Sequence, residues 1–173
     1  MPTWNFEGES ADPAQDPTMP PHKRQSYEEE LANAITHGIG LVLSVIGWIG
    51  LVLLSGWAGG GWELAAAAVF GGTLVFLYAT STLYHSVGTP RLKQTMRVLD
   101  HVAIFLLIAG TYTPFAALLL RDGWGWSILA LVWGLALVGL LFKLFSPHRF
   151  HPAATGLYLA MGWLGVLFVD PMS

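Results

Sequence analysis

The sequence contains no cysteine. Disulfides, thiolate metal ligands and cysteine nucleophiles are thereby excluded, so any metal site would use histidine, aspartate, glutamate or water. Charge is also scarce, because only 11% of the 173 residues are charged and the net charge is −3. Seven of the eleven acids fall within the first thirty residues, so the negative charge belongs to that segment. The chain lacks the clustered basic surface of a nucleic-acid-binding protein.

Hydrophobic residues, in contrast, make up 54% of the chain. The mean hydropathy of +0.55 is typical of an integral membrane protein with membrane lipids as its surroundings. Residues 1–26 are rich in proline and acids, and we expect them to form a disordered cytoplasmic tail without a signal peptide. Residues 27–173 are predicted to form one transmembrane helical domain, whose first span serves as the insertion signal.

Five apolar windows have the length that a membrane crossing requires, which is roughly 20 residues. The sequence therefore predicts an all-α, polytopic transmembrane bundle with spans near residues 34–54, 64–84, 102–120, 128–145 and 153–169. The last window is at the short limit for a crossing segment.

The orientation follows from the basic residues between these spans. Seven of the eight lysines and arginines fall on the side of the N-terminus, and Arg121 falls on the other side. The positive-inside rule therefore predicts a cytoplasmic N-terminus. The loops assigned to the outside carry an interfacial belt of tryptophans, namely Trp57, Trp62, Trp124 and Trp126.

The same alternation of spans places every histidine on the N-terminal side of the membrane. These residues are His22, His37, His85, His101, His148 and His151. Histidine tolerates the polar boundary of a membrane, so this clustering also has a purely structural explanation.

A polar group is expected where the second and third spans meet. Ser81 and His85 are one helical turn apart, with Ser81 roughly 6 Å deeper, and Asp100 opens the third span across a short loop. Such side chains avoid lipid and face the bundle interior, where they suit a zinc ion with an open water position. The alternative is that His85 and Asp100 only favour the ends of their helices.

Further polar and small residues have structural explanations as well as functional ones. Glu30, Asn33 and His37 share one face of the first span, or Glu30 simply stabilises the first helical turn. We expect Thr111, Thr113 and Pro114 to mark a kink, with a hydroxyl bonded to a freed carbonyl. Three basic residues are predicted to set topology and attract anionic head groups, namely Arg91, Lys93 and Arg97. Glycines are predicted to permit close helix packing, namely Gly38, Gly40, Gly47, Gly50, Gly71, Gly72, Gly134 and Gly139.

Four segments together resemble the bacterial haemolysin III family, within the superfamily of adiponectin and progestin receptors. They are ELANAITHG, STLYH, LDHVAIFLLIAGTYTP and LYLAMGW, and they occur in family order from about Glu29 to Trp163. The resemblance implies a seven-helix protein with a cytoplasmic N-terminus and a zinc ion near the cytoplasmic boundary. It implies that His85 is a zinc ligand, that Asp100 holds the metal-bound water and that Ser81 supplies a nearby hydroxyl.

The chain departs from the family pattern at its C-terminal end. It holds five predicted spans, and no H-x-x-x-H motif, which in the family supplies two further zinc ligands, occurs in it. His37, His101 and His151 lie on the correct side to substitute. The expectation is therefore a truncated family member with an incomplete metal site.

The resemblance and the polar group lead to two functional hypotheses. The first is a zinc-dependent hydrolase of lipid amides or esters in the bacterial cell membrane, impaired by truncation, with Asp100 and Ser81 as catalytic residues and His85 as the metal ligand. The alternative is a non-enzymatic protein that acts in cytolysis or membrane homeostasis.

Overall fold

The computed structural model describes residues 26–118, 123–145 and 151–168, and every regular element within these ranges is helical. The elements are α1 (Tyr27–Ala58), α2 (Gly61–Ser86), α3 (Pro90–Leu118), α4 (Gly123–Phe145), α5 (His151–Trp163) and the 3-10 helix η3 (Leu164–Phe168). The predicted all-α fold class is confirmed. The predicted tail, residues 1–26, lies outside the described residues apart from Ser26.

Four of the helices are long and apolar enough to cross a membrane. They contain the predicted spans 34–54, 64–84 and 128–145, and the third predicted span, 102–120, as far as residue 118. The fifth window, residues 153–169, extends to the limit of the described residues, and its crossing of the membrane stays a prediction. Its apolar helical part, Ala153–Val166, is shorter, and the α-helix ends at Trp163. The chain is thus a multi-pass membrane protein with four spanning helices among its described residues.

The first helix begins at a capping box. The Ser26 side chain accepts a hydrogen bond from the Glu29 backbone N–H at 3.2 Å, and the Glu29 carboxylate accepts one from the Ser26 N–H at 3.0 Å. This reciprocal pair satisfies two of the backbone donors that a helix N-terminus leaves without partners. The capping role in the first turn therefore belongs to Glu29, which leaves Glu30 for a tertiary contact.

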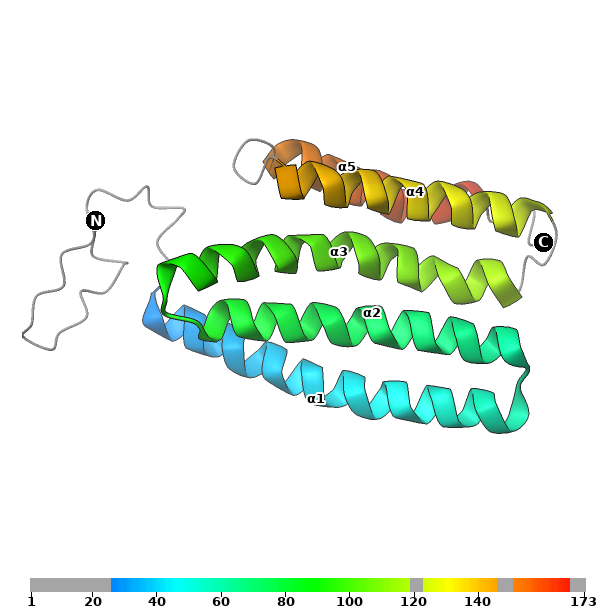
Figure 1. Cartoon of the computed structure of the whole chain (residues 1–173), viewed down its shortest axis with the longest axis horizontal. Helices are drawn as coiled ribbons and strands as arrows, with labels where there is room; N and C mark the ends of the chain where they lie inside the picture. The colour runs from blue at the N-terminus through cyan, green and yellow to red at the C-terminus, as the bar shows by residue number, and fades with distance from the viewer. Residues whose placement is uncertain (1–25, 119–122, 146–150, 169–173) are drawn as a thin grey trace, which may run out of the picture.

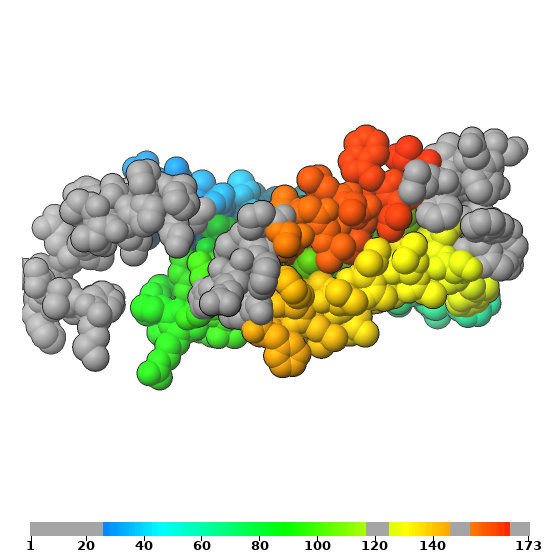
Figure 2. Space-filling model, turned by 90° about the horizontal axis from the view of Figure 1, so that it is seen from above, coloured from blue at the N-terminus to red at the C-terminus, as the bar shows by residue number. Residues whose placement is uncertain are grey.

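Successive helices run in alternating directions and pack mainly on their neighbours in the chain (Figure 1). The first three lie side by side, and α4 and α5 pack on α3 away from α1 (Figure 1). Figure 2 shows α4 and α5 forming one face, with the green end of the α2–α3 pair extending beyond them. One end of the bundle therefore gathers the starts of α1, α3 and α5 with the ends of α2 and α4. We call it the polar end.

The opposite end carries two of the tryptophans that the sequence assigned to the outer side of the membrane. The rings of Trp62 and Trp126 pack edge to face with centroids 5.3 Å apart, although they come from α2 and α4. The start of α2 and the start of α4 thus lie together at this end.

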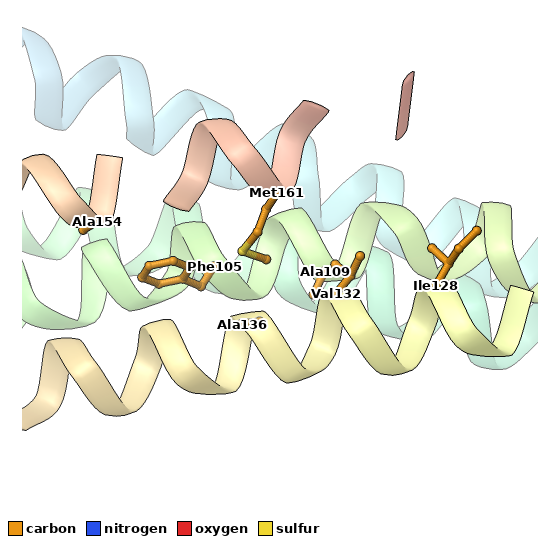
Figure 3. Packing of buried hydrophobic residues seen from close by; sticks show 7 residues of the cluster. All are labelled: Phe105, Ala109, Ile128, Val132, Ala136, Ala154 and Met161. Atoms are coloured by element: carbon orange, nitrogen blue, oxygen red, sulfur yellow. The ribbon is translucent and has the colours of Figure 1, made fainter. Parts of the chain in front are cut away.

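The main buried cluster joins α3, α4 and α5. Figure 3 shows Phe105, Val132 and Met161 pointing into the space between these helices. In contrast, α1 has a single buried residue, Ser44, and most of its large apolar side chains are exposed. Such exposure is costly in water but not in lipid, as expected for a helix at the edge of a membrane bundle.

Glycines allow close contact at some of the predicted positions only. A β-carbon at Gly71 would collide with the Trp48 side chain, and one at Gly139 would collide with Phe105. Gly47 and Gly50 have no such neighbour within 4 Å in the described structure. The small-residue packing is therefore confirmed for Gly71 and Gly139, and also for Gly40, where a β-carbon would collide with the Tyr78 side chain. Gly47, Gly50 and Gly134 face open space in the described structure.

Two further features shape the apolar half of the molecule. Thr111 and Thr113 donate to the carbonyls of Ile108 and Ala109 at 2.7 and 3.0 Å, and α3 continues through Pro114.

The Tyr112 hydroxyl supports the change from α5 to η3 through three backbone groups. It donates to the carbonyls of Met161 (2.8 Å) and Gly162 (3.1 Å) and accepts from the N–H of Gly165 (2.6 Å). Irregular backbone at membrane depth needs such internal partners.

Candidate functional site

The polar end is organised around the carboxylate of Glu30. One oxygen, Oε2, lies 2.8 Å from Nδ1 of His85, and the other, Oε1, accepts a hydrogen bond from Nζ of Lys93 at 2.7 Å. The three residues come from the first turn of α1, the last turn of α2 and the first turn of α3. Glu30 therefore ties together three helix ends.

This group is largely shielded from solvent. The side chains of Glu30, His85 and Lys93 are 17%, 10% and 31% exposed. The three-residue link between α2 and α3 brings His85 and Lys93 to the same level of the bundle. Because solvent screens such a group only partly, its ion pair and hydrogen bonds are stronger than those of exposed surface pairs.

The pairing also determines which nitrogen of His85 carries a hydrogen. An ionised carboxylate only accepts hydrogen bonds, so Nδ1 of His85 is the donor to Glu30. In the neutral ring, Nε2 then holds the lone pair that can accept a proton or bind a metal. The ammonium of Lys93 balances the negative charge of Glu30 on the side away from the ring.

Aromatic rings surround this pair. The Tyr84 ring lies 4.7 Å from the His85 ring between centroids, and Nζ of Lys93 lies 5.3 Å from the centroid of Tyr84, a cation–π contact. His37 lies two helical turns after Glu30 on α1, and its ring centroid is 5.6 Å from that of His85 and 5.9 Å from that of Tyr78. Nδ1 of His37 is buried and has no hydrogen-bond partner among the described residues.

Of the predicted site residues, His85 belongs to this group and Ser81 lies on the same helix. Ser81 is buried at 3% exposure, one turn deeper than His85. The carboxylate bonded to His85 is that of Glu30. The convergence of His85 and Asp100 on a shared ion or water stays a prediction.

The other histidines have separate positions. Nδ1 of His101 donates to the backbone carbonyl of Arg97 at 2.6 Å, and the Tyr158 hydroxyl donates to the His101 carbonyl at 2.8 Å. His151 opens α5, and nothing is described of its side chain. His22 and His148 lie outside the described residues.

The described side chains do not assemble a complete metal site. No group of three histidine, aspartate or glutamate side chains within residues 26–118, 123–145 and 151–168 is placed to hold a metal ion. Catalytic zinc commonly has three protein ligands. The part of the chain that the structure describes therefore does not by itself fit a catalytic zinc ion.

The sequence indicated some of this group but not its pairing. Glu30 and His37 share a face of the first span, and that pattern correctly marks the side of α1 that meets α2. Lys93 was assigned to membrane topology, and no sequence signal paired it with a residue sixty-three positions earlier. Their contact depends on how α1 is rotated against α2 and α3.

Comparison with known proteins connects these features to a family. The family model described as "Haemolysin-III related" matches residues 25–173. "Hemolysin-3" of Bacillus cereus is 45% identical over 148 residues, covering 86% of this chain and 68% of that protein. The "Hemolysin-3 homolog" of Bacillus subtilis is 43% identical over 147 residues, covering 85% of this chain and 69% of that protein.

A more distant relative is found in animals. The human "Monocyte to macrophage differentiation factor" is 24% identical over 150 residues, covering 84% of this chain and 62% of that protein. No solved structure matches. The family match over nearly all of the chain and the two bacterial similarities establish that this multi-pass membrane protein belongs to the haemolysin-III-related family.

Proposed function

We propose that the polar end is part of a zinc-dependent hydrolytic site acting on lipid amides or esters, in a cell membrane, with the start of α1 on the cytoplasmic side. The proposal is supported by family membership and by the position of a half-buried group of ionisable side chains at one end of an apolar bundle. Lipid is the substrate class that such a location favours, because it reaches the site from the surrounding membrane.

The observation that carries the proposal is the contact between Glu30 and His85. A carboxylate bonded to one ring nitrogen of histidine fixes the orientation and tautomer of the ring, so that the other nitrogen can bind a metal. In the proposed site Nε2 of His85 would be the atom available to a metal, Ser81 would position a substrate oxygen and Asp100 would be the proton acceptor.

The proposal requires metal ligands beyond those that the described residues supply. Because the described side chains include no set of three suitable ligands, further ligands have to come from outside them, and no reaction step is derived through zinc. His37 and His101 are the described histidines that could serve as substitutes.

Metal content tests the proposal directly. We expect the purified full chain to hold zinc in stoichiometric amount and His85→Ala to lose it. Glu28→Gln is the control, because Glu28 is exposed in the first turn of α1 and has no role in the proposed site, and it should retain zinc. Absence of stoichiometric zinc from the wild-type chain, or retention of zinc by His85→Ala, would count against the proposal.

A second function is favoured by α1 and by the names of the bacterial relatives. We propose as the alternative that the protein permeabilises membranes without catalysis, through insertion or self-association. The exposed apolar surface of α1 supports this alternative, as does the lack of a three-ligand group among the described residues. Dye leakage from liposomes should then persist in Asp100→Ala and with a zinc chelator present. Loss of leakage under both treatments would exclude it.

A further inference from the structure

One lysine near the polar end is mostly buried. Lys143 lies two residues before the end of α4 and is 5% exposed. The ion pairs found in the described part of the chain involve other residues. Burying most of a lysine side chain is unfavourable unless its ammonium has a polar or charged partner. An anion bound to the ammonium would supply such a partner.

Lys143 also lines an apolar cavity. The cavity has a volume of about 290 Å³ and lies between α3, α4 and α5. The residues that line it include Phe105, Val138, Phe142, Lys143, Ala154 and Leu157. Lys143 is thus a single charged side chain in an otherwise apolar lining, which is the composition expected for a ligand with a charged head and a hydrocarbon tail.

The orientation of the cavity fits such a ligand. Lys143 and Ala154 lie toward the polar end, because α4 ends and α5 begins there, whereas Val138 and Leu157 lie about a turn deeper in the bundle. Figure 3 shows Ala154 and Phe105 at the same end of the buried cluster. The start of α5 adds the positive end of a helix dipole beside Lys143. Positive charge therefore lies at the head-group level and the apolar lining lies deeper.

We propose that Lys143 binds the phosphate of an anionic membrane phospholipid, with part of an acyl chain in the cavity between α3, α4 and α5. The site is distinct from the Glu30, His85 and Lys93 group and does not depend on hydrolysis or zinc. Lysine binds phosphate as a point charge, and its long stem lets the ammonium reach the head-group level.

Lipid retention measured by native mass spectrometry tests this site. The full chain is extracted from bilayers of equal phosphatidylglycerol and phosphatidylcholine with identical acyl chains, and the ratio of the two retained lipids is measured. We expect phosphatidylglycerol to be enriched on the wild type and Lys143→Met to lower the ratio about fivefold, because one cation near lipid phosphate contributes on that scale. An unchanged ratio in Lys143→Met would overturn the proposal.

Arg91→Gln is the matched control, because Arg91 is exposed at the start of α3 and its loss removes one positive charge outside the cavity. It should leave the ratio within twofold of the wild type, and a loss equal to that of Lys143→Met would show general surface attraction and overturn the site. The melting temperature in pure phosphatidylcholine verifies that Lys143→Met is folded.

A second measurement needs no variant. Glycerophosphoglycerol, which has the head group without acyl chains, and inorganic phosphate should each fail to displace the retained phosphatidylglycerol from the wild type at millimolar concentration. Displacement by either would show that a free anion suffices and would overturn the role of the cavity. Displacement by oleate alone would show that the site binds a fatty-acid carboxylate, and it would overturn the assignment of a phospholipid as the ligand.

Discussion

Replacing Gly71 by alanine is expected to separate helix packing from helix propensity. Gly71 is buried on α2, and a β-carbon there would occupy the space of the Trp48 side chain on α1. At Gly72, the next residue on the same helix, a β-carbon would lie 3.7 Å from Cζ2 of Trp48, which is an ordinary contact. The two substitutions therefore share chemistry and helix but differ in the space available.

The expected magnitudes follow from these contacts. Alanine is favoured over glycine within a helix by about 0.8–1.0 kcal/mol in soluble hosts, and this gain applies to both variants. Forcing an extra carbon into a well-packed interface costs about 1–3 kcal/mol, and this cost applies to Gly71→Ala alone. We therefore expect the free energy of unfolding of Gly71→Ala to fall about 1–3 kcal/mol below that of Gly72→Ala.

Unfolding in mixed micelles with increasing denaturing detergent, followed by far-ultraviolet circular dichroism, gives these free energies. The thermal midpoint should differ in the same direction, by about 2–4 °C for each kcal/mol in a chain of this size. Combining Gly71→Ala with Trp48→Ala should abolish most of the difference, since the clashing group is removed. Equal stability of the two alanine variants would refute the packing described between α1 and α2.

The other predictions concern hydrogen bonds. Glu30→Gln should lower the free energy of unfolding by about 1–3 kcal/mol, because it removes the charge that holds His85 and Lys93. The control is Glu28→Gln, in the exposed first turn of α1, which should change the free energy of unfolding by less than about 0.5 kcal/mol. Detergent unfolding measures both, and equal effects would contradict a special role for Glu30. Tyr112→Phe should destabilise by a similar 1–3 kcal/mol, about the cost of buried groups left without partners, and should speed amide hydrogen exchange at Gly165. Unchanged exchange there would show that the hydroxyl does not support η3.

The sequence by itself determined the class of the protein and the ends of the bundle. Apolar runs of bilayer length have to cross or lie within a membrane, because a helix satisfies its backbone hydrogen bonds internally. Short links between four successive crossings then force His37, His85 and His101 to one end, whatever the details of packing. The same argument grouped the loop tryptophans, and the contact between Trp62 and Trp126 agrees with it.

Only the tertiary structure decided which side chains meet at the polar end. The sequence offered Asp100 as the partner of His85, because both lie near a short loop, yet the bonded carboxylate is that of Glu30 from α1. Successive residues point about 100° apart around a helix, so a small rotation of one helix changes its partners without moving its ends. That rotation is set by packing such as Trp48 against Gly71, which depends on the shapes of two helices together and not on the hydrophobic pattern of either.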